Sequence, residues 1–270
     1  MKFITPYLIS PAYFLRWATF AQPICGGGSL LGFGYGLYLA LWNSPPDYQQ
    51  GEMVRVMYIH VPAAWVGLMI YAAMAVAAGI GLVSRIVLAD VFCVAAAPVG
   101  AALVALCLVT GSIWGKPTWG TWWVWDARLT SVLILFLIYC GYIVLRNAFD
   151  DHKLGGKAGF ILLLVGAVNI PIVRFSVDWW HTLHQPASVL RSGGNAIAPT
   201  MMHPLLVMAL AYCLYAAFLV LMRMRTVLTA RDTEAMLHAS APRPSAGTEA
   251  RDIGNGSSGD LADKVNAPHL

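Results

Sequence analysis

The chain has 270 residues, of which 59% are hydrophobic and 11% are charged. This composition is far more apolar than that of a soluble domain and indicates an integral membrane protein. The formal net charge of +4 is modest, and basic residues in loops account for it, so it gives no indication of nucleic-acid binding. The five cysteines stand singly in or beside apolar runs, without a CxxC pair. They therefore argue against a disulfide framework or a cysteine metal site.

Six stretches of the chain are long and apolar enough to cross a bilayer core of about 30 Å. The sequence predicts an all-α integral membrane protein with six transmembrane helices, which form one membrane domain over residues 1–222. The composition then becomes rich in Ala, Ser, Gly, Pro, Asp and Arg, which predicts a disordered cytoplasmic tail over 223–270. The expected spans are 22–42, 60–83, 91–113, 129–146, 158–175 and 204–222.

Basic residues beside the expected spans are distributed unevenly. Nine lie on the side of both termini and five on the other side. Because cytoplasmic loops carry the excess of Lys and Arg, we expect both termini in the cytoplasm. This orientation places three loops together on the outer face, namely 43–59, 114–128 and 176–203.

One of these loops, 114–128, holds half of the ten tryptophans and reads WGKPTWGTWWVWDAR. Indoles gather at membrane surfaces because they are amphipathic, but five of them among turn-forming Gly and Pro residues exceed what attachment to the surface requires. We predict a flat aromatic platform with charged edges, suited to a large planar ligand that carries acidic groups. The tryptophans are Trp114, Trp119, Trp122, Trp123 and Trp125.

Four of the seven histidines fall on the predicted outer face: His60, His181, His184 and His203. A lone interfacial histidine is usually only a polar residue near water, but four beside five tryptophans suggest a metal or a metallocofactor. A zinc site needs three or four ligands, and no cysteine lies in these loops. Haem needs only two axial ligands, an apolar slot and cations for its propionates, so haem fits better. Spacing alone leaves open which two histidines bind.

The segment WGKPTWGTWWVWDARLTS resembles the tryptophan-rich "WWD" segment of haem-handling membrane proteins of cytochrome c biogenesis. Two further stretches, RVMYIHVPAAW (55–65) and DWWHTLHQPAS (178–188), are similar to those of one member family, haem exporter protein C (CcmC) of cytochrome c maturation. The resemblance covers roughly residues 20–222, and the three segments together are highly specific.

This resemblance implies His60 and His184 as the axial pair. His181 stands where the family has a polar non-ligand and His203 matches no family motif, and both remain candidates for a substitute ligand. The five tryptophans would then pack against a porphyrin edge. Arg55 and Arg128 are candidate propionate partners, since a guanidinium matches a carboxylate in two hydrogen bonds; contact with lipid headgroups is the alternative for both. Asp126 is expected to cap the following helix or to orient the loop.

The resemblance also implies a function. Haem b would be held non-covalently, in transit, at the periplasmic face of the bacterial inner membrane and delivered to a haem chaperone (CcmE). Further partners would be a small membrane subunit (CcmD) and an ABC-type pair (CcmA and CcmB). The chain would position haem rather than act as an enzyme. The alternatives are a b-type membrane cytochrome, which usually buries facing histidines within its helices, and a haem permease subunit, for which broken polar helices are typical.

Overall fold

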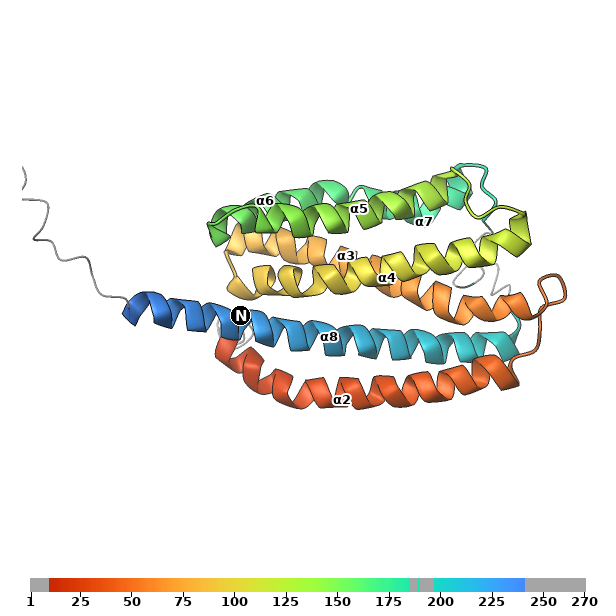
Figure 1. Cartoon of the computed structure of the whole chain (residues 1–270), viewed down its shortest axis with the longest axis horizontal. Helices are drawn as coiled ribbons and strands as arrows, with labels where there is room; N and C mark the ends of the chain where they lie inside the picture. The colour runs from red at the N-terminus through yellow and green to blue at the C-terminus, as the bar shows by residue number, and fades with distance from the viewer. Residues whose placement is uncertain (1–9, 185–188, 190–196, 241–270) are drawn as a thin grey trace, which may run out of the picture. The chain divides into compact units, whose positions relative to one another are not determined.

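The computed structural model describes residues 10–184, 189 and 197–240. The chain divides into two compact units, Met1–Thr229 and Ala230–Leu270. Figure 1 labels the helices of the described part. The elements are α2 (Pro11–Tyr38), the π-helical turn η1 (Leu39–Asn43), the 3-10 helix η2 (Glu52–Val56), α3 (Met57–Ser84), α4 (Val87–Trp119), α5 (Ala127–Asn147), α6 (His152–Gly166), α7 (Asn169–Trp179) and α8 (Pro199–Ser240).

Six helical segments are long and apolar enough to cross a membrane, which confirms the predicted all-α architecture. The fifth is interrupted between α6 and α7. Pro171 has no backbone N–H to continue the helical ladder, and the Ala167 carbonyl accepts from the Ile170 N–H at 3.0 Å. The buried side chain of Asn169 donates to the Ser131 carbonyl of α5 at 2.9 Å. The segments are Pro11–Asn43, Glu52–Ser84, Val87–Trp119, Ala127–Asn147, His152–Trp179 and Pro199–Leu237.

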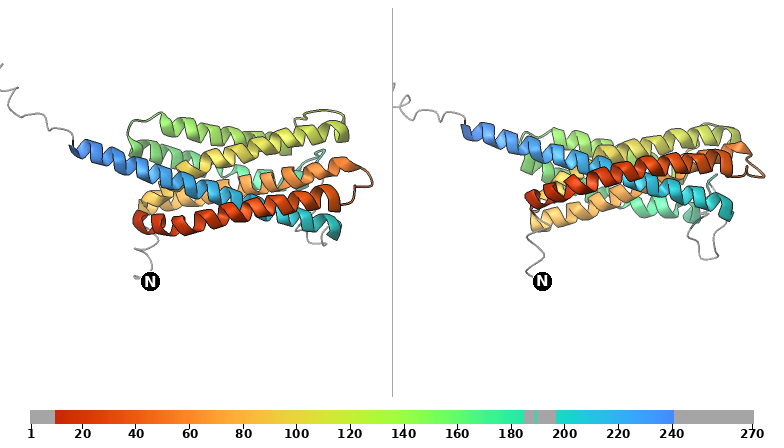
Figure 2. Two further views of the ribbon diagram at one scale, coloured as in Figure 1. Left: turned by 60° about the horizontal axis from the view of Figure 1, so that its bottom comes forward. Right: turned by 90° about the horizontal axis from the view of Figure 1, so that it is seen from below.

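Helices α3 and α4 form the centre of the first unit. They lie between α5, α6 and α7 on one side and α2 and α8 on the other (Figures 1 and 2). Tyrosine hydroxyls connect the layers inside the apolar core: Tyr139 donates to the Gly67 carbonyl at 2.8 Å and Tyr71 to the Leu163 carbonyl at 3.0 Å. Buried polar groups need such partners, so these two bonds fix how α5 and α6 sit against α3.

Three connections gather at one end of this bundle, as the sequence predicted. They are the turn between η1 and η2, the short loop between α4 and α5, and residues 180–184 after α7 (Figure 1). Residues 185–188 and 190–196 of the expected loop 176–203 lie outside the described residues. The α3–α4 and α5–α6 connections lie at the opposite end. The assignment of the first end to the outer side of a membrane remains a prediction from charge.

The tryptophan-rich loop is shorter than expected. Helix α4 continues to Trp119, so Trp114 and Lys116 lie on its last turns rather than in a loop. The helix ends at Gly120, whose positive φ of 78° suits glycine and whose N–H donates to the Lys116 carbonyl at 3.0 Å. Only residues 120–126 connect α4 to α5.

The start of the expected tail is also corrected. Helix α8 continues to Ser240, so the expectation of disorder is wrong for residues 223–240. This stretch contains neither proline nor glycine and is rich in residues of high helix propensity. The rest of the predicted tail, 241–270, lies outside the described residues.

Candidate functional site

His60 lies in the first turn of α3 and its imidazole rests on α4. Its Nδ1 lies 3.0 Å from the Cys107 carbonyl oxygen and 3.1 Å from Thr110 Oγ1. Gly111 makes this close approach possible, because a Cβ at that position would lie 2.9 Å from His60 Cε1. The ring of His60 is therefore fixed against a glycine on the neighbouring helix.

These contacts decide where the imidazole proton lies. A carbonyl oxygen only accepts hydrogen bonds, and the Thr110 hydroxyl already donates to the Leu106 carbonyl at 2.7 Å. Nδ1 of His60 must therefore carry the proton and donate. Its Nε2, which makes no hydrogen bond to the described residues, keeps a free lone pair. A histidine that donates through one nitrogen and coordinates through the other is the usual arrangement of a metal ligand.

Two tryptophans of α4 each contact one of the two histidines. The ring of Trp114 meets the His60 ring nearly at right angles, with 5.8 Å between centroids. One turn later, Trp119 folds back over Gly115, where a Cβ would lie 2.9 Å from the indole. The Trp119 ring then contacts His184, with 5.0 Å between centroids. The end of α4 thus places one indole beside each of the two predicted ligands.

His184 lies in the segment after α7, and its Nδ1 is buried with no hydrogen-bond partner among the described residues. Burial, followed by the charges of Arg128 and His60, lowers the pKa of His184 to about 3. The imidazole is therefore neutral at physiological pH, the form that binds a metal. A buried polar nitrogen without a partner is costly, and a bound metal ion is one group that would satisfy it.

Arg128 is a cation close to this pair. It follows the N-terminus of α5, donates from Nε to Ser176 Oγ at 3.1 Å and from Nη2 to the Arg174 carbonyl at 3.3 Å. Its charge acts on both imidazoles. The predicted propionate partner on this side is therefore held in place by α7.

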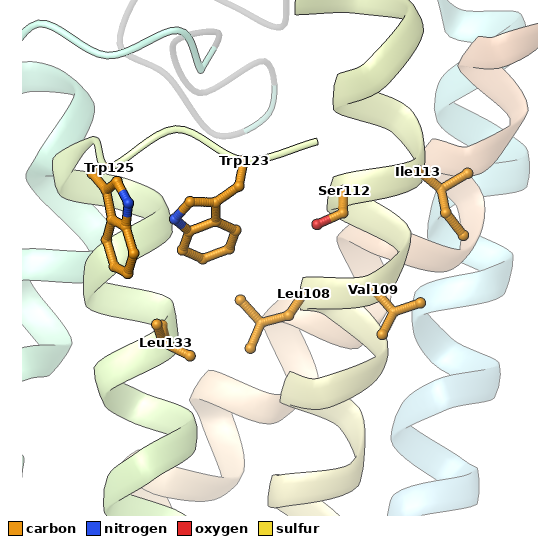
Figure 3. Close-up of a pocket in the computed structure, with 7 residues that line it drawn as sticks. All are labelled: Leu108, Val109, Ser112, Ile113, Trp123, Trp125 and Leu133. Carbon is orange, nitrogen blue, oxygen red and sulfur yellow. The ribbon is translucent and has the colours of Figure 1, made fainter. Parts of the chain in front are cut away.

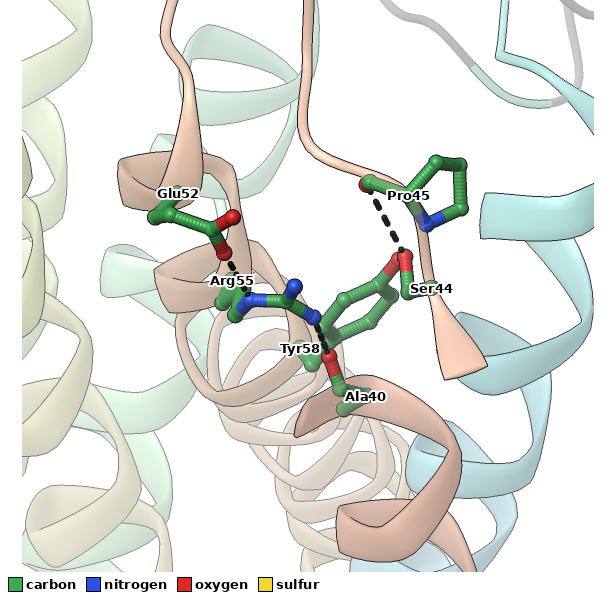
Figure 4. Close-up of polar contacts among 6 residues, drawn as sticks. All are labelled: Ala40, Ser44, Pro45, Glu52, Arg55 and Tyr58. Atoms are coloured by element: carbon green, nitrogen blue, oxygen red, sulfur yellow. Dashed lines mark hydrogen bonds and ion pairs between the residues drawn. The ribbon is translucent and has the colours of Figure 1, made fainter. Parts of the chain in front are cut away.

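Arg55 already forms hydrogen bonds to two oxygen atoms of this chain. Its Nε donates to Glu52 and its Nη1 to the Ala40 carbonyl of the π-helical turn, beside a contact between the Ser44 and Tyr58 hydroxyls (Figure 4). Glu52 is 68% exposed and Arg55 20%. Because Glu52 is largely in contact with solvent, its side of the ion pair contributes little to stability, so another carboxylate can replace Glu52 at small cost.

The five tryptophans do not form one flat platform, which corrects the sequence prediction. Trp123 and Trp125 pack edge to face, at 77°. They line a shallow pocket of about 510 Å³. Its other lining residues include Leu108, Ser112 and Leu133 (Figure 3). This pocket takes residues 108, 109, 112 and 113 of α4, whereas His60 uses 107, 110, 111 and 114. The two sets lie on different faces of the helix, because facing residues recur every three or four positions.

The remaining predicted residues are less central. Trp122 is exposed, with Lys116 Nζ 5.9 Å from its ring centroid. Asp126 caps α5, since its Oδ1 accepts from the Leu129 N–H at 2.8 Å, and its buried Oδ2 has no partner in the described part of the chain. His181 is exposed. His203 is exposed on α8 and its ring contacts that of Tyr35.

A family model matches most of the chain. The model of CcmC, described as "Heme exporter protein C", matches residues 4–239. The chain belongs to the CcmC family. It is 47% identical over 236 residues to heme exporter protein C of Bradyrhizobium diazoefficiens, covering 87% of this chain and 89% of that protein. It is also 47% identical over 217 residues to heme exporter protein C of Escherichia coli K12, covering 80% and 84%.

The likeness extends to a plant protein. This CcmC-family chain is 44% identical over 194 residues to a putative cytochrome c biosynthesis ccmC-like mitochondrial protein of Marchantia polymorpha. The match covers 72% of this chain and 82% of the plant protein.

Sequence reasoning did not single out three residues of the candidate site. Thr110 and Gly111 receive the His60 ring, and Gln50 Oε1 accepts from Trp114 Nε1 at 2.7 Å. Thr110 and Gly111 precede Trp114 by four and three positions, so their shared helix face was visible in the sequence. No local pattern relates Gln50 to a tryptophan so far along the chain.

Proposed function

We propose that this chain holds haem b, non-covalently and in transit, between His60 and His184, and delivers it to the haem chaperone CcmE. The main support for this proposal is that α4 places an indole against each of these two histidines. The same helix accepts a hydrogen bond from Nδ1 of His60 and so leaves its Nε2 free. Family membership supports haem as the cargo.

The other site residues take roles that follow from their surroundings. Arg128 is placed to pair with one propionate, because its charge already acts on both histidines. Arg55 pairs with the other by exchanging Glu52 for the propionate. Trp114 and Trp119 flank the porphyrin, and Asp126 fixes the start of α5.

The exposed tryptophans serve delivery in this proposal. Trp122 and Trp125 are 57% and 75% exposed, and with Trp123 they form an aromatic surface in the α4–α5 connection on which a chaperone can dock. Large exposed aromatic groups of this kind are typical of binding surfaces. The chain itself makes no covalent bond; it positions haem for a reacting side chain of the chaperone.

The location and partners complete the proposal. The basic residues favour cytoplasmic termini, so the site faces the periplasm of a bacterial inner membrane. The chain then works in a complex with the small subunit CcmD and the ABC subunits CcmA and CcmB.

Covalent loading of the chaperone tests this function. The full chain is reconstituted with the chaperone and haem, and covalently haem-bound chaperone is measured by in-gel haem staining. His60→Ala and His184→Ala should each abolish loading, because each removes an iron ligand. His203→Ala, at an exposed site against Tyr35, is the matched control and should load like the wild type. Full loading by either of the first two variants would refute the proposal.

A further inference from the structure

The turn between η1 and η2 contacts the candidate haem site through the side chain of Gln50. Gln50 is half-buried, and its Oε1 accepts a hydrogen bond of 2.7 Å from Trp114 Nε1. An indole N–H can only donate, so the amide oxygen of Gln50 must face it. The bond joins two residues that are 64 positions apart in the chain.

The turn is built so that Gln50 has little freedom. Asp47 Oδ1 accepts from the backbone N–H groups of both Gln49 and Gln50 at 2.9 Å. The backbones of Asp47 and Gly51 exchange two hydrogen bonds, of 3.1 and 2.9 Å. Gly51 has φ +57°, a conformation that favours glycine. The backbone of Gln50 is thus fixed on both sides.

Trp114 transmits this constraint to His60. The indole stands nearly perpendicular to the imidazole, with 5.8 Å between centroids. A second constraint comes from residues one and two turns earlier in α4, because Cys107 and Thr110 hold the imidazole at Nδ1. Rotation of the imidazole about its Cβ–Cγ bond is therefore limited by hydrogen bonds at Nδ1 and by the Trp114 ring at its side.

We infer that Gln50 is a positioning residue for the haem ligand His60, acting through the hydrogen bond that holds Trp114. It does not touch haem. Its role is to set the Trp114 indole, which in turn sets the plane of the imidazole and so the orientation of Nε2 toward iron. This inference rests on the proposed function, and it gives the turn between η1 and η2 a part in that function.

The test compares Gln50→Leu with the matched control Gln49→Leu, whose parent residue is the exposed neighbour of Gln50. Purified full-length protein is titrated with ferric haem, and the electron paramagnetic resonance g-values report the orientation of the axial imidazoles. Gln50→Leu leaves the Trp114 N–H without a partner and should weaken haem binding roughly tenfold, with shifted g-values. Gln49→Leu should match the wild type.

Two further variants separate positioning from a general loss of folding. Gln50→Glu keeps an acceptor oxygen and should restore the wild-type g-values. In a Trp114→Phe background, which has no indole N–H, Gln50→Leu should cause no additional change. An effect of Gln50→Leu that persists in this background, or wild-type g-values in Gln50→Leu, would overturn the inference.

The outcome is distinguishable from failure of the proposed function. His60→Ala is included in the same titration. If His60→Ala binds haem with a wild-type spectrum, the proposed function fails. If His60→Ala loses the spectrum while Gln50→Leu behaves like Gln49→Leu, only the role of Gln50 is refuted.

Discussion

At the scale of single residues, Gly111 is the most direct test of how His60 is held. Gly111→Ala would place a methyl group 2.9 Å from His60 Cε1 and push the ring away from Cys107 and Thr110. Overpacking of this kind costs about 1–3 kcal/mol, so we expect haem content to fall about tenfold. Gly34→Ala, in α2 with open space around the new methyl, is the control and should retain haem, as measured by pyridine haemochrome. Equal haem content in both variants would contradict the described contact.

Residues differ in how far their roles were predictable. His60 and His184 stood in recognisable segments, and the structure brings a tryptophan of α4 against each. The flat platform was wrong, because sequence order does not reveal that Trp123 turns to the opposite face of α4 from Trp114. The partner of Trp114, Gln50, depends on a contact between distant segments, for which a single sequence carries no local signal.

At the scale of elements, Asp126 fixes where α5 begins. Its Oδ1 accepts from the Leu129 N–H at 2.8 Å, and loss of such a cap costs about 1 kcal/mol. Asp126→Ala should therefore lower the thermal midpoint by about 2–4 °C, given the size of the chain. Asp126→Ser, which keeps a capping oxygen, should show a midpoint near that of the wild type. A thermal midpoint in Asp126→Ala equal to that of the wild type would contradict the capping role.

The positions of the helices were predictable, whereas several of their ends were not. Apolar run length marks six spans because the bilayer core sets a minimum length, and all six correspond to helical segments. The extension of α4 to Trp119 was missed, because Gly115 and Pro117 suggested turns. The helix nevertheless continues through both residues, and the Trp119 ring packs over Gly115 one turn earlier in the same helix.

At the scale of the whole molecule, delivery requires the three gathered connections to face the periplasm. Reporter fusions after Gly120 and after residue 240 should report opposite sides of the membrane, with Gly120 on the periplasmic side, because the basic residues favour cytoplasmic termini. Alkaline phosphatase and green fluorescent protein fusions measure the two sides independently. Fusions that report the same side would contradict the orientation and with it the access of a periplasmic chaperone.

The optical and electron paramagnetic resonance spectrum of the purified, haem-loaded protein tests the central claim most directly. Two neutral imidazoles on one iron predict a low-spin, six-coordinate spectrum in the wild type. His60→Ala and His184→Ala should each convert it to a five-coordinate, high-spin spectrum or lose haem, while His203→Ala keeps the low-spin signal. A low-spin wild-type spectrum that survives in His184→Ala, or one that disappears in His203→Ala, would contradict ligation by His60 and His184.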